Sequence, residues 1–178
     1  RGFAADKITY ADVKYYENED YANTNMVESL MAAKQEFDDD VIVSYSDVLF
    51  EEGMLRGMME REDDFAVAVD INWQEYWQAR YGKVDFDTES LSLDGNDNII
   101  ELGLEAPKLE DIDARYIGLL KFSKNALSEI VAIHDRDYES YQNRPWKQSG
   151  KTIRKAYMTD LLQAVIESGN HVKAVKFR

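Results

Sequence analysis

Residues 41–69 read VIVSYSDVLFEEGMLRGMMEREDDFAVAV, and this stretch decides the fold class. The apolar runs Val41 to Tyr45 and Phe65 to Val69 have the length and composition of buried strands. Glu51 to Glu60, which lies between them, has helical spacing. Its expected inward side chains are Met54, Leu55, Met58 and Met59. A strand, a helix and a second strand predict a βαβ unit in an α/β fold, with a mainly parallel sheet and helices on its faces.

The same alternation continues in both directions along the chain. Lys7 to Val13 is a short β-rich run, and apolar side chains at helical intervals follow it from Met26 to Phe37. Asn25 stands at the expected N-cap of that helix. The remaining expected elements are a hairpin in 91–103 with its turn at 94–98, a strand at 116–122, helices at 124–133 and 156–168, the second ended by Gly169, and a final strand at 171–177.

The composition indicates a single globular domain over residues 1–178, since 44% of the residues are apolar. Lys and Arg number 21 against 35 Asp and Glu, and this excess of carboxylates argues against a nucleic-acid partner. The chain has no Cys, which excludes disulfides and thiolate chemistry. No apolar run approaches the roughly 20 residues of a membrane helix. We therefore expect a soluble, cytoplasmic protein with no membrane partner.

Two candidate ligand sites follow expected strands. Asp47 comes just after the run that ends in Tyr45, at the edge of an α/β sheet where ligands bind. A carboxylate there can hold a Mg²⁺ ion that bridges nucleotide phosphates, and the alternative is a turn residue or helix cap. The segment Thr24 to Leu30 offers backbone N–H groups and short polar side chains at a helix start, and the alternative is simple capping.

Two further candidates involve aromatic and acidic side chains. Four aromatic residues share one expected short helix near the acidic stretch Asp85 to Glu89: Trp73, Tyr76, Trp77 and Tyr81. Aromatic faces beside carboxylates can enclose an ammonium group, although such aromatics are more often plain core. Thr159 and Asp160, at the start of the last helix, either face a pocket or complement the helix dipole.

Four segments, in this order, resemble the nucleotidyltransferase superfamily, and most closely the cytidylyltransferases of choline phosphate and 2-aminoethylphosphonate. The segments are Tyr21-Ala22-Asn23-Thr24-Asn25-Met26-Val27-Glu28-Ser29-Leu30, Val41 to Asp47, Tyr116-Ile117-Gly118-Leu119-Leu120-Lys121-Phe122-Ser123 and Tyr157-Met158-Thr159-Asp160-Leu161-Leu162. The resemblance implies a Rossmann-like mixed sheet of the nucleotide-diphospho-sugar transferase type. It also implies attack of a phosphate or phosphonate oxygen on the α-phosphorus of a nucleoside triphosphate, with release of pyrophosphate.

The resemblance also implies roles for individual residues. Asp47 would be the catalytic metal ligand for Mg²⁺, and Thr24, Asn25 and Ser29 would lie near the nucleotide. The residues implied around the acceptor are Trp73, Trp77, Glu89, Tyr116, Tyr157, Thr159 and Asp160. The expected partners are CTP or another nucleoside triphosphate and a small phosphonate or phosphate acceptor.

The chain departs from the family pattern at both ends. Members begin with a Gly-rich loop that grips the triphosphate and continue into an acidic segment with a second metal ligand, and neither appears in 1–178. We therefore expect a longer native protein, and a homo-oligomer or a fused partner domain is compatible with this pattern. The leading hypothesis is a Mg²⁺-dependent cytidylyltransferase. The alternatives are a sugar-1-phosphate nucleotidyltransferase and a non-catalytic, truncated interaction module.

Overall fold

The computed structural model describes residues 1–178 and contains one six-stranded sheet of order β1-β5-β2-β6-β4-β3. The strands are β1 (Val41–Ser44), β2 (Phe65–Asp70), β3 (Glu89–Leu93), β4 (Asn98–Glu105), β5 (Arg115–Phe122) and β6 (Val172–Phe177). The α-helices are α1 (Met26–Met31), α2 (Glu52–Met59), α3 (Trp73–Tyr81), α4 (Lys124–Tyr141) and α5 (Met158–Glu167). Short 3₁₀ turns cover Ala5–Lys7, Lys34–Glu36, Leu109–Asp111 and Ile153–Lys155.

The sheet is mixed, as predicted, but the expectation that it is mainly parallel is wrong. Only β2 and β6 pair in parallel, and every other neighbouring pair of strands is antiparallel. β5 is the reason, because it inserts between β1 and β2 and runs antiparallel to both. The strand–helix–strand unit over 41–69 thus has two strands of the same direction that are not neighbours.

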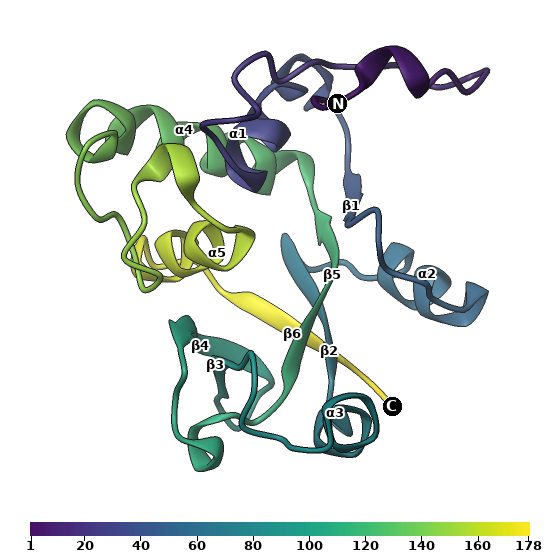
Figure 1. Ribbon diagram of the computed structural model, residues 1–178, viewed down its shortest axis with the longest axis vertical. Helices are drawn as coiled ribbons and strands as arrows, with labels where there is room; N and C mark the ends of the chain where they lie inside the picture. Colours follow the sequence, from purple (N-terminus) through teal and green to yellow (C-terminus); the bar gives the residue numbers. More distant parts are fainter.

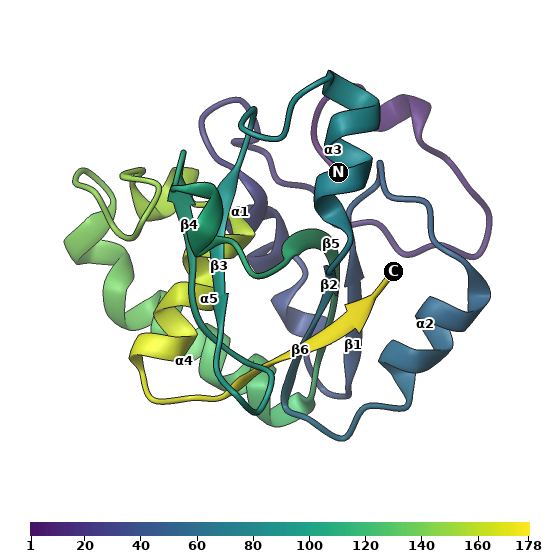
Figure 2. The same cartoon turned by 90° about the horizontal axis from the view of Figure 1, so that it is seen from below.

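Helices cover both faces of the sheet, and β2 shows how its sequence accommodates them. Phe65, Val67 and Val69 belong to the large core beneath α1, α4 and α5, whereas Ala66 and Ala68 pack with Met58 of α2 on the opposite face. Side chains alternate between faces along a strand, so a strand buried on both sides appears as one unbroken apolar run. Figures 1 and 2 show α4 and α5 on one side of the central strands and α2 on the other.

Local signals predicted most of the element boundaries. The Asn25 side chain caps α1 by accepting from the Met26 N–H, and the Ser123 hydroxyl caps α4 by accepting from Ala126 N. Asp94 forms the hairpin turn by accepting from the N–H groups of Asn96 and Asn98. α5 ends at Glu167, and Gly169 follows its C-cap with a φ of 90°, in the left-handed region that favours glycine.

Four local expectations are corrected. The helix expected at 124–133 is longer, since α4 continues to Tyr141. Residues 7–13 form no strand and are exposed, because no neighbouring strand offers them hydrogen bonds. The apolar series from Met26 to Phe37 is not one helix, since α1 ends at Met31 and a 3₁₀ turn follows. Met59 is 62% exposed, and Met58 is the buried methionine of α2. None of the helices is both long enough and apolar enough to span a membrane.

Candidate functional site

Three cavities meet at Tyr45, directly after β1, and its side chain lines all of them. We name them after one lining residue each: the Thr24 cavity (about 800 Å³), the Glu89 cavity (about 510 Å³) and the Trp77 cavity (about 640 Å³). Because each shares Tyr45 with the other two, the three cavities are neighbours around this residue.

Gly118 of β5 allows Tyr45 to occupy this position. Its φ is 79°, and a Cβ there would lie 2.7 Å from Cδ2 of Tyr45. A glycine is therefore required both by the backbone conformation and by the close approach of the ring. Two residues before it, Tyr116 packs edge-to-face on Tyr45 with ring centroids 5.8 Å apart. β5 thus contributes both the glycine that admits the Tyr45 ring and the Tyr116 ring that packs on it.

The Thr24 cavity contains all three residues implied near a nucleotide, Thr24, Asn25 and Ser29, together with Asp47. Its neutral polar side chains are held by hydrogen bonds within the protein. The Thr24 hydroxyl donates to the Asp20 carbonyl at 2.8 Å, and the Asn18 amide donates to the hydroxyls of Thr24 at 2.9 Å and Ser29 at 3.2 Å. This wall is held in place without a ligand.

Asp47 lies in the turn after β1, exposed to solvent, and lines both the Thr24 cavity and the Trp77 cavity. The chain contains no group of three His, Cys, Asp or Glu side chains that could hold a metal ion by itself. Mg²⁺ usually keeps several waters and is held by one or two carboxylates together with substrate phosphates. Asp47 is therefore suited to a metal ion shared with a bound triphosphate and not to a resident one.

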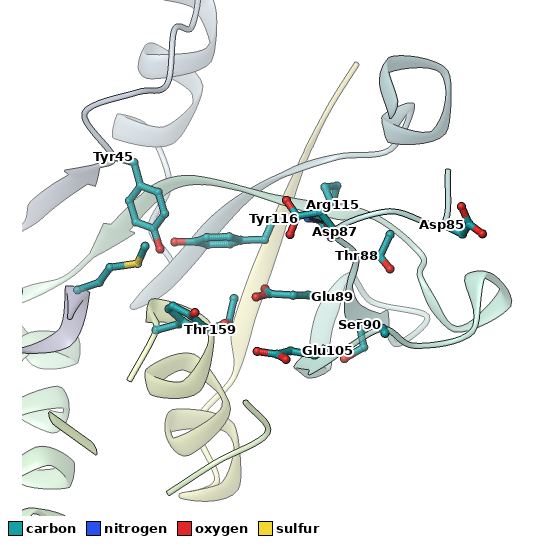
Figure 3. Close-up of a pocket in the computed structure, with 13 residues that line it drawn as sticks. Tyr45, Asp85, Asp87, Thr88, Glu89, Ser90, Glu105, Arg115, Tyr116 and Thr159 are labelled. Carbon is teal, nitrogen blue, oxygen red and sulfur yellow. Dashed lines mark hydrogen bonds between the residues drawn. The ribbon is translucent and has the colours of Figure 1, made fainter. Parts of the chain in front are cut away.

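The Glu89 cavity contains four of the residues implied around the acceptor: Glu89, Tyr116, Tyr157 and Thr159. Glu89 of β3 pairs with Glu105 of β4, and Figure 3 shows both carboxylates extending from this hairpin into the cavity. Gly103 has a φ of 90°, and a Cβ there would lie 3.2 Å from the Thr159 side chain. The absence of a side chain at 103 thus allows α5 to bring Thr159 close to the hairpin.

Burial shifts the titration of several groups here. Desolvation raises the pKa of Glu89, and the nearby positive charge of Arg115 only partly opposes this effect. Desolvation lowers the pKa of Arg115 in turn, against the charges of Glu89 and Asp87. Burial also raises the pKa of Tyr45 to about 12 and that of Tyr116 well above its usual value, so both hydroxyls stay protonated. Charged groups in this cavity are poorly solvated.

Trp73 and Asp160 lie outside all three cavities, against the expectation that they surround an acceptor. Trp73 is 2% exposed and packs with Trp77 and Ile112, which is the core alternative raised for these aromatics. The Asp160 carboxylate accepts from the Tyr157 N–H at 2.9 Å and from the Ser149 hydroxyl at 2.7 Å. Asp160 therefore caps α5 and holds the preceding loop through its hydrogen bonds to Ser149.

Trp77 does line a cavity, but its ring is not free to enclose an ammonium group. Its indole N–H donates to the Phe86 carbonyl at 2.7 Å, and the Arg115 guanidinium lies 4.5 Å from the ring centroid. The protein's own cation therefore occupies the ring face.

Sequence reasoning missed Tyr45, Arg115 and Glu105 as site residues. Arg115 is a basic residue at the start of an apolar strand, directly before Tyr116, and that position was the available signal. Glu105 could be identified as a site residue only from its pairing with Glu89 across the two strands. Nothing local distinguishes Tyr45 from an ordinary strand residue, because its role depends on Gly118 of another strand.

Comparisons with known proteins bear on these cavities. No family model matches the chain. The sequence is 36% identical, over 171 residues, to the CTP:phosphoglutamine cytidylyltransferase of Campylobacter jejuni subsp. jejuni serotype O:2, which covers 91% of this chain. The chain spans 64% of the length of that relative.

Two solved structures share the fold. The inositol-1-phosphate CTP transferase from T. maritima matches 90% of this chain and 54% of its own length, with a TM-score of 0.58 and 15% identity. A protein described as a glucose-1-phosphate thymidylyltransferase, from Bacillus anthracis, matches 93% of this chain and 56% of its own length, with a TM-score of 0.59 and 12% identity. Sequence and fold together confirm the resemblance to the nucleotidyltransferase superfamily and to its cytidylyltransferases.

Proposed function

We propose that this chain, which resembles the nucleotidyltransferases in both sequence and fold, carries the substrate cleft of a cytidylyltransferase. The reaction would transfer a cytidylyl group from CTP to a small phosphorylated acceptor and release pyrophosphate. The observation that carries the proposal is the meeting of two different cavities at Tyr45, in a chain similar to a cytidylyltransferase over 91% of its length. Asp47 lies at the edge of this junction.

The Thr24 cavity is the proposed nucleotide site. The side chains Thr24, Asn25 and Ser29 present neutral polar groups, and the volume of about 800 Å³ is in the usual range for a small-molecule pocket. In nucleotidyl transfer the protein chiefly positions the reactants and compensates the phosphate charge. A wall whose hydrogen bonds are already formed is suited to positioning, because little order must be created when the ligand binds.

Mg²⁺ is the proposed cofactor, with Asp47 as its protein ligand. When bound, the ion would neutralise the triphosphate and polarise the α-phosphorus toward attack. The chain's own contribution is to hold the Asp47 carboxylate in a turn at the mouth of two cavities, exposed and free of other partners. Tyr45, kept protonated by its burial, lines the same two cavities and the Glu89 cavity as well.

The Glu89 cavity is the proposed acceptor site. An aminophosphonate or an amino-alcohol phosphate carries an amine as well as a phosphorus group, as does phosphoglutamine, the molecule in the relative's name. The half-buried Glu89 carboxylate can accept hydrogen bonds from such an ammonium group. We propose that a small, amine-bearing phosphate or phosphonate binds with its amine toward Glu89 and its phosphorus toward Asp47.

Pyrophosphate release by the protein, expressed from its full coding sequence, tests the proposal. We expect release with CTP in preference to the other three nucleoside triphosphates, with an amine-bearing acceptor, and only when Mg²⁺ is present. Preference for UTP or dTTP with a sugar 1-phosphate would instead establish the sugar-nucleotide alternative. Silence with every pair would favour a non-catalytic interaction module.

Asp47→Asn is the matching variant, because it keeps the shape of the side chain and removes its charge. We expect pyrophosphate release to fall by about a hundredfold or more, as when a principal electrostatic group is removed from an active site. Asp38→Asn is the control, since Asp38 is also exposed and precedes the same strand at its other end. Equal activity of the two variants would overturn the assignment of Asp47.

A further inference from the structure

Buried polar atoms without hydrogen-bond partners gather in the Glu89 cavity. The chain has four such side-chain atoms, and three of them belong to residues that line this cavity: Nη1 of Arg115, the hydroxyl of Tyr116 and Oγ1 of Thr159. Buried polar groups are nearly always hydrogen-bonded in folded proteins, and leaving one unpaired costs about 1–3 kcal/mol. Their concentration around one cavity indicates that a ligand completes them.

Arg115 is oriented by its other contacts so that Nη1 stays available. Its Nη2 donates to the Asp87 carbonyl at 2.5 Å, and its Cζ lies over the Trp77 ring, 4.5 Å from the ring centroid. A guanidinium held on one edge and on one face keeps its remaining N–H groups for a planar anion such as a carboxylate.

Glu89 supplies the opposite charge. No hydrogen bond or ion pair engages its carboxylate, whereas the neighbouring Glu105 is paired with Lys151 at 3.4 Å. The charges of Arg115 and Glu89 affect each other's pKa, but the two side chains form no direct ion pair. Both groups therefore remain available to a ligand. Figure 3 shows Glu89 and Arg115 on the same side of the cavity, opposite Tyr45.

A ligand that satisfies both groups must carry both charges. A simple amine would leave Arg115 Nη1 unpaired, and a simple carboxylate would bring a third carboxylate beside Glu89 and Glu105 with no positive charge of its own to offset it. The zwitterion of an α-amino acid carries a carboxylate and an ammonium on the same carbon atom and matches the requirement.

We propose that the Glu89 cavity recognises an α-amino-acid head group, whose carboxylate accepts from Arg115 and whose ammonium donates to Glu89. The hydroxyls of Tyr116 and Thr159 complete the hydrogen bonds around it. The inference rests on the proposed function for the rest of the acceptor, since the phosphorylated end then extends toward Asp47. It adds Arg115 as the residue that determines specificity for a carboxylate-bearing acceptor.

Calorimetric titration with phosphorylated probes of two lengths tests this head group. The probes are O-phospho-L-serine and O-phospho-L-homoserine, each compared with one analogue that lacks the carboxylate and one that lacks the ammonium. We expect at least one of the amino acids to bind about tenfold tighter than both of its analogues, equivalent to about 1.4 kcal/mol. Binding within about threefold of an analogue at both lengths would overturn the proposal.

Two variants separate the two charges. Glu89→Gln is expected to abolish the preference for the ammonium and retain that for the carboxylate, and Arg115→Met, which removes the positive charge, is expected to do the reverse. Glu75→Gln and Arg56→Met, exposed changes on α3 and α2, are the controls and should preserve both preferences. Melting curves of each variant show that it is folded before its preferences are compared. Equal loss of both preferences in a folded Glu89→Gln protein would also contradict the assignment.

The outcome is distinguishable from failure of the proposed function. Equal rates of pyrophosphate release from CTP with phosphoethanolamine and with the phosphorylated amino acids would retain the cytidylyltransferase and overturn the amino-acid head group. Selective binding of the amino acids without pyrophosphate release with any acceptor would retain the head-group site and remove the proposed reaction.

Discussion

The Thr24 cavity and the Glu89 cavity share Tyr45 but hold their polar side chains in opposite ways. In the Thr24 cavity the polar groups are half-exposed or exposed, and they bond to one another through Asn18. In the Glu89 cavity the hydroxyls of Tyr116 and Thr159 are buried and unpartnered, beside an unpaired Glu89. The polar side chains of the Thr24 cavity have hydrogen-bond partners without a ligand, whereas those hydroxyls of the Glu89 cavity do not.

The difference indicates how specificity is divided between the cavities. A completed wall gains little by forming new hydrogen bonds, so it positions a ligand whose affinity comes from elsewhere, such as charged phosphates. An incomplete wall rejects any ligand that fails to satisfy it, because the unpaired groups remain buried. If the Glu89 cavity binds the acceptor as proposed, selection among acceptors lies in this cavity.

The largest expected effect follows from a substitution at Gly118, because Tyr45, which lines both cavities, packs against this glycine. Gly118→Ala adds a Cβ 2.7 Å from the Tyr45 ring and forces a residue with a side chain into a φ of 79°. We expect a loss of about 3 kcal/mol in the free energy of unfolding, from overpacking and backbone strain together. Urea unfolding measures this loss.

Gly53→Ala is the matched control for Gly118→Ala. A Cβ at Gly53 in α2 meets nothing within 4 Å, and alanine is the better helix former. We expect this variant to gain about 0.5 kcal/mol. Similar effects of the two substitutions would show that Tyr45 is not held by Gly118.

A smaller effect is expected at Asp160, which supports the Glu89 cavity from behind. Asp160→Ala removes the cap of α5 and the hydrogen bonds to Ser149, and we expect a loss of about 2 kcal/mol in the free energy of unfolding. Ser149→Ala removes only part of this network and should cost about 1 kcal/mol. A fully stable Asp160→Ala protein that no longer binds acceptor would instead restore Asp160 as a ligand contact.

The contrast between the two walls predicts opposite signs for two conservative substitutions. Thr24→Val removes a hydroxyl that makes two hydrogen bonds and should destabilise the protein by about 1 kcal/mol. Tyr116→Phe removes a buried hydroxyl without a partner and should stabilise the ligand-free protein by up to about 1 kcal/mol. Thermal unfolding of both variants without ligand gives the comparison, which fails if the two shifts have the same sign.

The smallest expected effect concerns the pH dependence of Glu89. Because burial raises the pKa of Glu89 in the folded protein, the folded state binds more protons than the unfolded state between the two pKa values, and stability falls as pH rises through that window. Glu89→Gln should therefore raise the melting temperature near pH 7 and lose this advantage at pH values below the unfolded pKa. An advantage that is equal at both pH values would mean that Glu89 is not desolvated.

The sequence predicted most elements, and nine of the eleven site residues that it suggested line the three cavities. Strands such as β2 and helices such as α5 were predicted because their signals, an unbroken apolar run or a terminal glycine, lie within a few residues. Lys7 to Val13 failed because the strand propensity of that segment has no partner in the sheet. Trp73 and Trp77 could not be told apart by type, since only packing decides that one is core and the other borders a cavity.

By itself, the sequence determined the alternation of strands and helices, the acidic surface, and the presence of Asp47 after β1 and of Thr24 before α1. These are local properties, set by periodicity, capping and composition. Only the tertiary structure decided that β5 separates β1 from β2, that Gly118 admits the Tyr45 ring, and that Arg115 and Glu89 face one cavity. The physical reason is that strand order, close approach and desolvation arise from contacts between segments far apart in the chain.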